Sequence, residues 1–525
     1  MRLIKSTAII SSLTMVSRVL GLVRDIMLAR FLGASVINDA LITATKLPNL
    51  FRRMFAEGAF NAAFIPLYAR RLEEEGEDAA AQFAGEAMSA LSFLVLIIVL
   101  GFQITMPWTL NIIGGGLDKV AAEPGGIVPY DLAVLYAQIT MPYLMLMSLA
   151  ALFSGMLNTR NYFAIAAFVP ILLNIVWISI LAAASGAGWP LQSLALYLSI
   201  GMTFSGVLQA GLLFWGLRRA GVQLPLVRPR LTPGVKRLVT LGVPGLLSAG
   251  ITHINLLVSH RISTLQESAP SWLYYSDRLY QLPLGIIGIA MGIALLPSLS
   301  RRLRAGDEEG ALVSMNRAIE IAAYLTIPSA VALAIMPEFL VGGLFERGQF
   351  GVGDTEQTAK ALKMFAFGLP AFVLLKVLTP AFFAREDTKT PMIFAGMSAV
   401  INLAVGATLF FTVGFFGLAL ATSIAGWGNV ICLAFILLRE QHLVLDARLV
   451  RRLPRIALAS ALMGGALWFL SKWAVPKLSG SILNDYGLLM VVCGAGLSIY
   501  VFCAFIVRAF DLSDFRDAFR RTPRA

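Results

Sequence analysis

The sequence predicts an all-α polytopic membrane protein. Of its 525 residues 58% are hydrophobic and only 14% are charged, and the mean hydropathy is +0.78. A water-soluble chain of this length needs a more highly charged surface. Apolar runs long enough to cross ~30 Å of hydrocarbon recur from one end to the other. Together these features exclude disorder, secretion and a cytosolic enzyme.

Fourteen apolar segments, bounded by charges, Gly and Pro, are predicted to be membrane-spanning helices. The first follows a basic start but contains Arg18 and Asp25 and has no cleavage pattern at its end, so we interpret it as a retained helix and not a signal peptide. The segments lie at about residues 6–32, 36–68, 80–113, 130–156, 162–185, 190–217, 236–261, 271–299, 316–345, 357–384, 390–412, 415–438, 453–474 and 484–508.

The distribution of Lys and Arg predicts the orientation. With fourteen helices, 26 of the 42 basic residues fall in segments on the same side as the N-terminus. Because cytoplasmic loops retain positive charge during insertion, both termini are expected in the cytoplasm. Most of the net charge of +12 is thus explained by topology, and we predict no nucleic-acid binding.

An internal repeat organises the chain. Residues 40–71 align without a gap on residues 271–302, and residues 158–174 align on residues 386–402, so that each half has an Asn near the middle of a helix. With about six helices per repeat, the halves are expected to be related by an axis along the membrane normal. We therefore predict an N-terminal lobe at 1–230, a C-terminal lobe at 231–445, and appended helices 13 and 14 with a cytoplasmic tail at 446–525.

Metal and cofactor chemistry is not predicted. The three cysteines lie in apolar runs, and the three histidines have no clustered Cys or carboxylate partners. These residues are Cys432, Cys493, Cys503, His253, His260 and His442. We interpret them as packing residues or polar residues on helix faces.

Nine basic residues fall inside the predicted helices: Arg18, Arg24, Arg30, Lys46, Arg52, Arg53, Arg278, Arg317 and Lys376. A cation at the bilayer centre costs at least ~2.5 to 3.5 kcal/mol, so such residues face protein or water and commonly serve function. One interpretation is a water-filled, electropositive cavity. The other is compensation one residue at a time, in which Arg53 pairs with Glu57 and Arg18 with Asp25, while Arg30 and Arg317 near helix ends reach the interface.

Three arginines are the best candidates for contact with an anionic ligand. Arg24 and Arg52 have no acidic residue three or four positions away, and Arg278 follows Asp277 directly, so that their side chains point about 100° apart on a helix. These features favour the cavity interpretation.

Two long motifs carry a resemblance to a known family. The run SRVLGLVRDIMLARFLGAS (17–35), followed by NDALITATKLPNLFRRMFAEGAFNAAFIPLYARR (38–71), resembles the start of MurJ/MviN family proteins, the lipid II flippases of bacterial peptidoglycan synthesis. The segments 274–302, 344–350 and 376–391 are also similar. The resemblance covers nearly the whole chain.

The resemblance implies a MOP-superfamily fold of two six-helix lobes plus two C-terminal helices, which carries lipid II from the inner to the outer leaflet of the bacterial inner membrane by alternating access. Lipid II, membrane lipids and the cell-wall synthesis machinery are the implied partners. No cofactor is implied, and a coupling cation or the membrane potential is left open as the energy source. The resemblance implies that the pyrophosphate is bound by Arg18, Arg24, Arg52 and Arg278. The implied acidic cavity or coupling residues are Asp25, Asp39, Glu57 and Asp277. Further cavity or gating candidates are Ser17, Arg53 and Lys376.

The residues themselves suit this chemistry, because guanidinium groups bind phosphate oxygens in a forked geometry and stay charged. Three alternatives are weighed. A glycosyltransferase or lipid phosphatase is disfavoured, since no Asp-x-Asp pair or His/Asp nucleophile constellation is present. A cation-coupled MOP-superfamily exporter of another amphipathic substrate or lipid-linked oligosaccharide would have the same fold, but an exporter of cations should present carboxylates. A structural scaffold would leave the buried charges unexplained.

Overall fold

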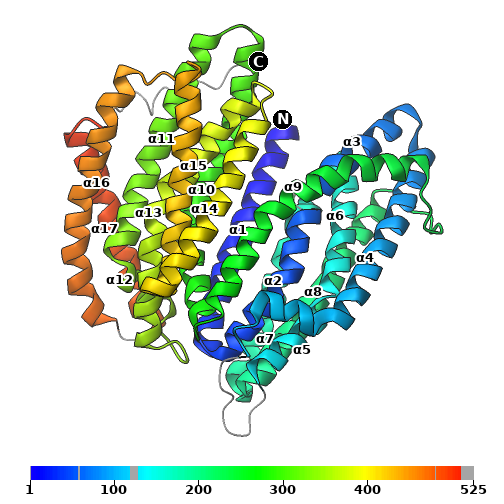
Figure 1. The fold of residues 1–525 in the computed structure, drawn as a ribbon, viewed down its shortest axis with the longest axis horizontal. Coiled ribbons are helices and arrows are strands. Elements are labelled where there is room, and N and C mark those ends of the chain that lie inside the picture. Colours follow the sequence, from blue (N-terminus) through cyan, green and yellow to red (C-terminus); the bar gives the residue numbers. More distant parts are fainter. Residues whose placement is uncertain (1, 57–58, 119–127, 479–480, 510–525) are drawn as a thin grey trace. The chain divides into compact units, whose positions relative to one another are not determined.

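The computed structural model describes residues 2–56, 59–118, 128–478 and 481–509, and within these ranges every regular element is a helix (Figure 1). There are seventeen α-helices and one short 3-10 helix in these ranges, which confirms the predicted all-α class. The chain forms two compact units, Met1–Ser271 and Trp272–Ala525.

The first unit contains nine complete helices. They are α1 (Arg2–Leu32), α2 (Val36–Ala56), α3 (Ala59–Glu74), α4 (Glu77–Gly114), α5 (Pro129–Thr140), α6 (Tyr143–Thr159), α7 (Phe163–Ala187), α8 (Leu191–Arg219) and α9 (Pro233–Ser263). Apolar side chains from α1 to α8 form one buried core, in which α7 packs against both α1 and α8. This packing places the charged first helix beside an apolar neighbour.

The second unit begins within the first turn of α10 (Ala269–Arg304). It continues with α11 (Glu308–Ile335), α12 (Pro337–Phe345), α13 (Val352–Phe383), α14 (Lys389–Val413), α15 (Phe416–Arg439), α16 (Ala447–Ala474), the 3-10 helix η1 (Val475–Lys477) and α17 (Ile482–Ile506). Helix α13 packs against both α11 and α15, and α16 packs against α11 and α17.

All fourteen predicted segments fall on helices, but two of them contain two helices each. The segment at 130–156 is divided at Met141–Pro142 and that at 316–345 at Met336–Pro337, because proline lacks the N–H that would continue the helical ladder. Helices α2 and α3 lie in the segment at 36–68, on either side of residues 57–58, which are outside the described ranges. Ten helical segments among the described residues are long and apolar enough to span a membrane. The count of fourteen crossings stays a prediction.

The two units do not coincide with the predicted repeats. The boundary of the repeats was predicted at residue 230, whereas the first unit extends to Ser271 and includes α9, which packs against α3 and α4. The appended helices α16 and α17 belong to the second unit. The repeat-based division into lobes therefore stays a prediction.

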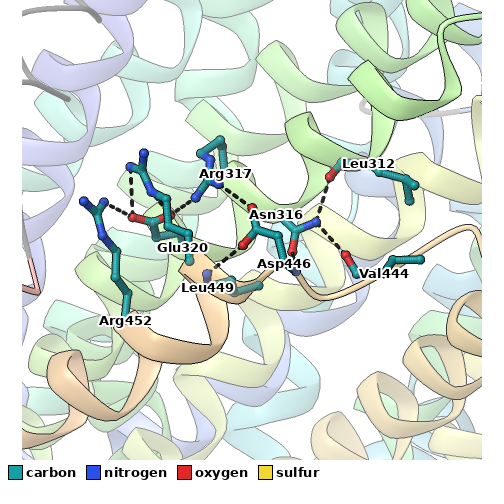
Figure 2. A network of polar contacts seen from close by, with 9 residues as sticks. Leu312, Asn316, Arg317, Glu320, Val444, Asp446, Leu449 and Arg452 are labelled. Carbon is teal, nitrogen blue, oxygen red and sulfur yellow. Dashed lines mark hydrogen bonds and ion pairs between the residues drawn. The ribbon is translucent and has the colours of Figure 1, made fainter.

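One end of α16 is fixed to α11 by an ionic network, which Figure 2 shows. Glu320 on α11, 7% exposed, accepts hydrogen bonds from Arg317, Arg448 and Arg452. Arg317 also pairs with Asp446, whose other oxygen caps α16 by accepting the Leu449 N–H at 2.7 Å. The expectation that Arg317 reaches the interface stays a prediction, and the structure adds that it pairs with Glu320, one helical turn away on the same face.

The other end of the appended pair is fixed by a buried ion pair. Arg347, just after α12, donates to Asp485 in the first turn of α17 at 3.0 Å, and the two side chains are 6% and 2% exposed. Its guanidinium also donates to the carbonyls of Gly343 and Leu344 and lies over the Tyr486 ring at 4.7 Å. Arg347 therefore joins the carboxyl end of α12 to the amino end of α17.

Apolar packing fills the length between these two attachments. Buried side chains of α11 and α12 meet those of α16 and α17 in one cluster, and the Tyr500 hydroxyl donates to the Tyr324 carbonyl at 2.7 Å. Gly464 allows the close approach, since a Cβ there would lie 2.7 Å from Cγ1 of Val331. In Figure 1 the orange and red helices α16 and α17 lie beside α11 and α12.

Breaking the buried pair should loosen the appended helices. Replacing Arg347 with Ala leaves the Asp485 carboxylate buried without its charge partner, a change that typically costs ~3 to 5 kcal/mol. We expect a clear fall in the thermal unfolding midpoint of the detergent-purified protein. Arg302→Ala, which removes an exposed pair with Asp307, serves as the control and should cost less than about 1 kcal/mol. Equal shifts of the unfolding midpoint in the two variants would contradict the stabilising role of the Arg347–Asp485 pair.

Candidate functional site

Arg24 on α1, a predicted ligand-binding arginine, is surrounded by polar and aromatic partners. Its Nε and Nη2 both donate to Oδ1 of Asp25, at 3.0 and 2.7 Å, and its Nη1 donates to Oδ1 of Asn174 at 3.0 Å. The guanidinium also lies 5.4 Å from the centroid of the Trp177 ring. The side chains of Arg24 and Asp25 are only 12% and 4% exposed. A charged pair is thus held inside the first unit by two residues of α7.

Asn174 also fixes the backbone of α1. Its Nδ2 donates to the carbonyl of Ser17 at 3.0 Å, while its Oδ1 accepts from Arg24. The amide therefore links two points of α1 that are seven residues apart, and Ser17, a predicted cavity residue, contributes its carbonyl to this link.

Asp39, in the first turn of α2, accepts hydrogen bonds from residues at the start of α10. Its Oδ2 accepts the N–H of Ser268 at 2.8 Å, and its Oδ1 accepts the N–H and the hydroxyl of Ser271 at 2.9 and 2.5 Å. A carboxylate at this position satisfies N–H groups that have no partner within the helix and complements the helix dipole. Asp39 is 1% exposed, and Asn38 beside it donates to the Gly33 carbonyl and to the Ser271 hydroxyl. The pair fixes the start of the helix at the predicted segment 271–299, the second segment of the predicted C-terminal lobe.

The other predicted residues of the first unit have varied surroundings. Arg18 and Arg52 are partly buried in α1 and α2, and Arg53 is exposed one position later. Glu57, the predicted partner of Arg53, lies outside the described residues, so their pairing stays a prediction. Arg30 is exposed near the end of α1, with its guanidinium 5.6 Å from the Phe31 ring centroid.

In the second unit, Asp277 and Arg278 are partly buried on α10 and have different neighbours. Asp277 accepts a hydrogen bond from Gln281, and the Arg278 guanidinium lies 4.6 Å from the Tyr274 ring centroid. Lys376 on α13 is exposed.

Sequence reasoning missed the partners of Arg24. It considered only acidic residues three or four positions away, whereas the long arginine side chain folds back onto the adjacent Asp25. Arg18 was the predicted partner of Asp25, but the aspartate pairs with Arg24. The repeat did reveal Asn174 as a polar residue within an apolar helix. Only the packing of α7 on α1 shows that this residue contacts Arg24.

The described residues include helices long enough to span a membrane, and charged, hydrogen-bonded side chains lie inside the first unit. These features are typical of polytopic membrane transporters. The fold is similar to that of a solved structure described as "Lipid II flippase MurJ, inward closed conformation", with a TM-score of 0.77 at 24% identity over 95% of this chain and 98% of that one. It is also similar to a "multidrug resistance MATE family transporter of the MOP superfamily", with a TM-score of 0.65 at 17% identity over 83% and 98%.

Sequence comparison identifies the family. The family model described as "Lipid II flippase MurJ" matches residues 28–483. The chain is 40% identical to "Probable lipid II flippase MurJ" of Rhizobium meliloti over 99% of this chain and 97% of the relative. It is 32% identical to "Lipid II flippase MurJ" of Burkholderia cenocepacia over 84% of each. The chain therefore belongs to the MurJ family of lipid II flippases, which are transporters and not enzymes.

The geometry predicts that Asn174 stabilises the contact between α1 and α7. Asn174→Ala removes an acceptor from a partly buried arginine and a donor from the α1 backbone, and hydrogen bonds to charged groups contribute ~1.5 to 3 kcal/mol. We expect Asn174→Ala to lower the thermal unfolding midpoint of the detergent-purified protein. An unchanged midpoint would mean that these two hydrogen bonds do not stabilise the fold.

A double-variant cycle tests whether Asn174 acts through Arg24. The loss caused by Asn174→Ala should be clearly smaller when Arg24 is already Ala, because residues in direct contact do not contribute additively. Additive losses would mean that Asn174 stabilises the helix pair independently of the arginine.

Proposed function

We propose that this protein carries lipid II from the inner to the outer leaflet of the bacterial inner membrane by alternating access. Two things support the proposal: membership of the MurJ family along most of the chain, and arginines kept inside membrane helices at a cost that a merely structural role does not require. The first is the observation that carries it. We further propose the inner membrane as the location, with both termini in the cytoplasm and the cell-wall synthesis machinery as a partner.

In this proposal Arg18, Arg24, Arg52 and Arg278 bind the pyrophosphate of lipid II. A guanidinium offers two parallel N–H donors to a phosphate, and it remains charged at every physiological pH. Arg24 is held by Asp25 and Asn174, so a pyrophosphate would replace or share contacts that the guanidinium already makes. An arginine with protein partners has a stable unloaded state, which suits a site that must release its substrate.

The acidic residues would then set the balance between the loaded and unloaded states. Asp25 competes directly for the Arg24 guanidinium. Asp39 holds the first turn of α10, and Asp277 lies next to Arg278 on that helix. We propose Asp25, Asp39, Glu57 and Asp277 as coupling residues, with Ser17, Arg53 and Lys376 as further gating candidates. Either a coupling cation or the membrane potential would supply the energy.

An exporter of cationic compounds is the second candidate, since the fold is similar to that of a MATE transporter. The charge of the helices argues against it. Two of the carboxylates inside the described helices, Asp25 and Asp39, are already occupied by an arginine and by a helix amino terminus. An anionic substrate fits the arginine excess of α1 and α2 better.

Replacement of the proposed arginines should impair lipid II binding according to their chemistry. Arg24→Ala and Arg278→Ala each remove a forked donor, and loss of one charge-assisted contact typically weakens binding roughly ten- to hundredfold. Lysine keeps the charge without the fork, so Arg24→Lys and Arg278→Lys should have intermediate function. We would measure lipid II binding to purified variants, and growth of cells depleted of their own lipid II flippase, at matched amounts of folded protein.

The control for this series is Arg304→Ala, an exposed arginine at the end of α10. Arg317 would be unsuitable as a control, because it belongs to the Glu320 network. Normal binding and growth with both alanine variants would refute the pyrophosphate assignment, and failure of the whole wild-type chain to restore growth would refute the function.

The proposed orientation predicts where single cysteines react. In a background without Cys432, Cys493 and Cys503, Ala187→Cys at the exposed end of α7 should react with an impermeant thiol reagent from outside the cell. Ala305→Cys, in the exposed turn between α10 and α11, should react only after the membrane is opened. The reverse pattern would invert the topology.

A further inference from the structure

The arginines at the start of α16 differ in their contacts and exposure. Arg448 and Arg452 face α11 and pair with Glu320 (Figure 2). Arg451 and Arg455 are exposed, and neither pairs with a carboxylate of any residue that the structure describes. The Glu320 network thus engages Arg448 and Arg452, whereas Arg451 and Arg455 remain exposed.

The exposed pair continues a lipid-facing stripe. At 100° per residue, Arg451 and Arg455 lie within about 60° of Leu458 and Leu462 around the helix axis, and Phe469 has the same direction as Arg451. These three apolar side chains are 51%, 50% and 70% exposed. From Arg451 to Phe469 the stripe is about 27 Å long, close to the thickness of the hydrocarbon core. The arginines therefore lie where the headgroup of a lipid packed along the stripe would be.

The end of α17 adds a third arginine at the same level. Arg455 donates from Nη1 to the carbonyl of Arg508 at 3.1 Å, just beyond the last turn of α17. The Arg508 side chain is exposed and has no ion pair with a residue in the described ranges. Meanwhile Glu320 and Asp446, the nearby carboxylates, already pair with Arg317, Arg448 and Arg452. Among the described residues, positive charge at this end of the helix pair is therefore left without a carboxylate partner.

We propose that Arg451, Arg455 and Arg508 bind the phosphate of an anionic glycerophospholipid, whose acyl chains lie along Leu458, Leu462 and Phe469. Topology alone requires basic residues on one side of the membrane, but not in line with a lipid-facing stripe. Charge complementarity selects an anionic lipid over a zwitterionic one, because each basic residue near an anionic headgroup adds to the attraction. The site is separate from the arginines proposed for lipid II and does not depend on that proposal.

The test uses the full-length protein purified in a neutral detergent. Phosphatidylglycerol or phosphatidylcholine is titrated in, and bound lipid is counted by native mass spectrometry. Arg451→Gln/Arg455→Gln should bind phosphatidylglycerol roughly ten- to thirtyfold more weakly and phosphatidylcholine unchanged. The matched control, Arg301→Gln/Arg304→Gln, removes the same charge from exposed positions at the end of α10 and should change binding about twofold or less. The single variant Arg451→Gln removes no described contact within the protein, and it provides the same comparison if the double variant does not fold.

Three results would overturn the proposal. Equal losses in the two double variants would indicate a general effect of net charge. Unchanged phosphatidylglycerol binding in Arg451→Gln/Arg455→Gln would mean that no such site exists. Loss of lipid II binding with normal phosphatidylglycerol binding would assign these arginines to the substrate path. Conversely, retained binding in Arg451→Lys/Arg455→Lys would support a site that recognises charge at this position.

Discussion

The pairing of charges within apolar helices is the constraint on which the rest of this structure depends. A guanidinium or carboxylate placed among lipid-spanning helices has no bulk water to solvate it, so the protein must supply its partners. In the first unit, Asp25, Asn174 and Trp177 do this for Arg24, and the same contacts hold α7 against α1. The contacts that this buried charge requires thereby also determine which helices pack together.

The second unit uses the same principle at the two ends of its appended helices. Glu320 gathers three arginines at one end, and Arg347 pairs with Asp485 at the other, with apolar packing along the length between them. Ion pairs of this kind add less net stability than apolar packing would, but they fix position and rotation because only one register satisfies them. The appended pair is therefore an integral part of its unit.

The internal repeat shows how two copies of one helical pattern acquire different contacts. Asn174 and Asn402 occupy equivalent positions, yet the first contacts Arg24 and the Ser17 carbonyl, whereas the second accepts from Thr422. The difference arises because α1 has an arginine, Arg24, within reach of Asn174. The repeat thus predicts that an asparagine lies within an apolar helix in each half. The charges that differ between the halves determine what each asparagine contacts.

The sequence alone determined the membrane class, the positions of the helices and the arginine excess, because these depend on composition, hydropathy and the length needed to cross a bilayer. Its motifs carried the resemblance that the comparisons then established as family membership. Breaks such as that at Met336–Pro337 were missed, since hydropathy continues across them. Only the tertiary structure decided that Arg24 pairs with Asp25, that Arg317 belongs to the Glu320 network, and that Asp39 caps α10. The physical reason is that hydrogen bonds and ion pairs depend on distances of a few ångströms between side chains far apart in the chain, which periodicity and composition do not specify.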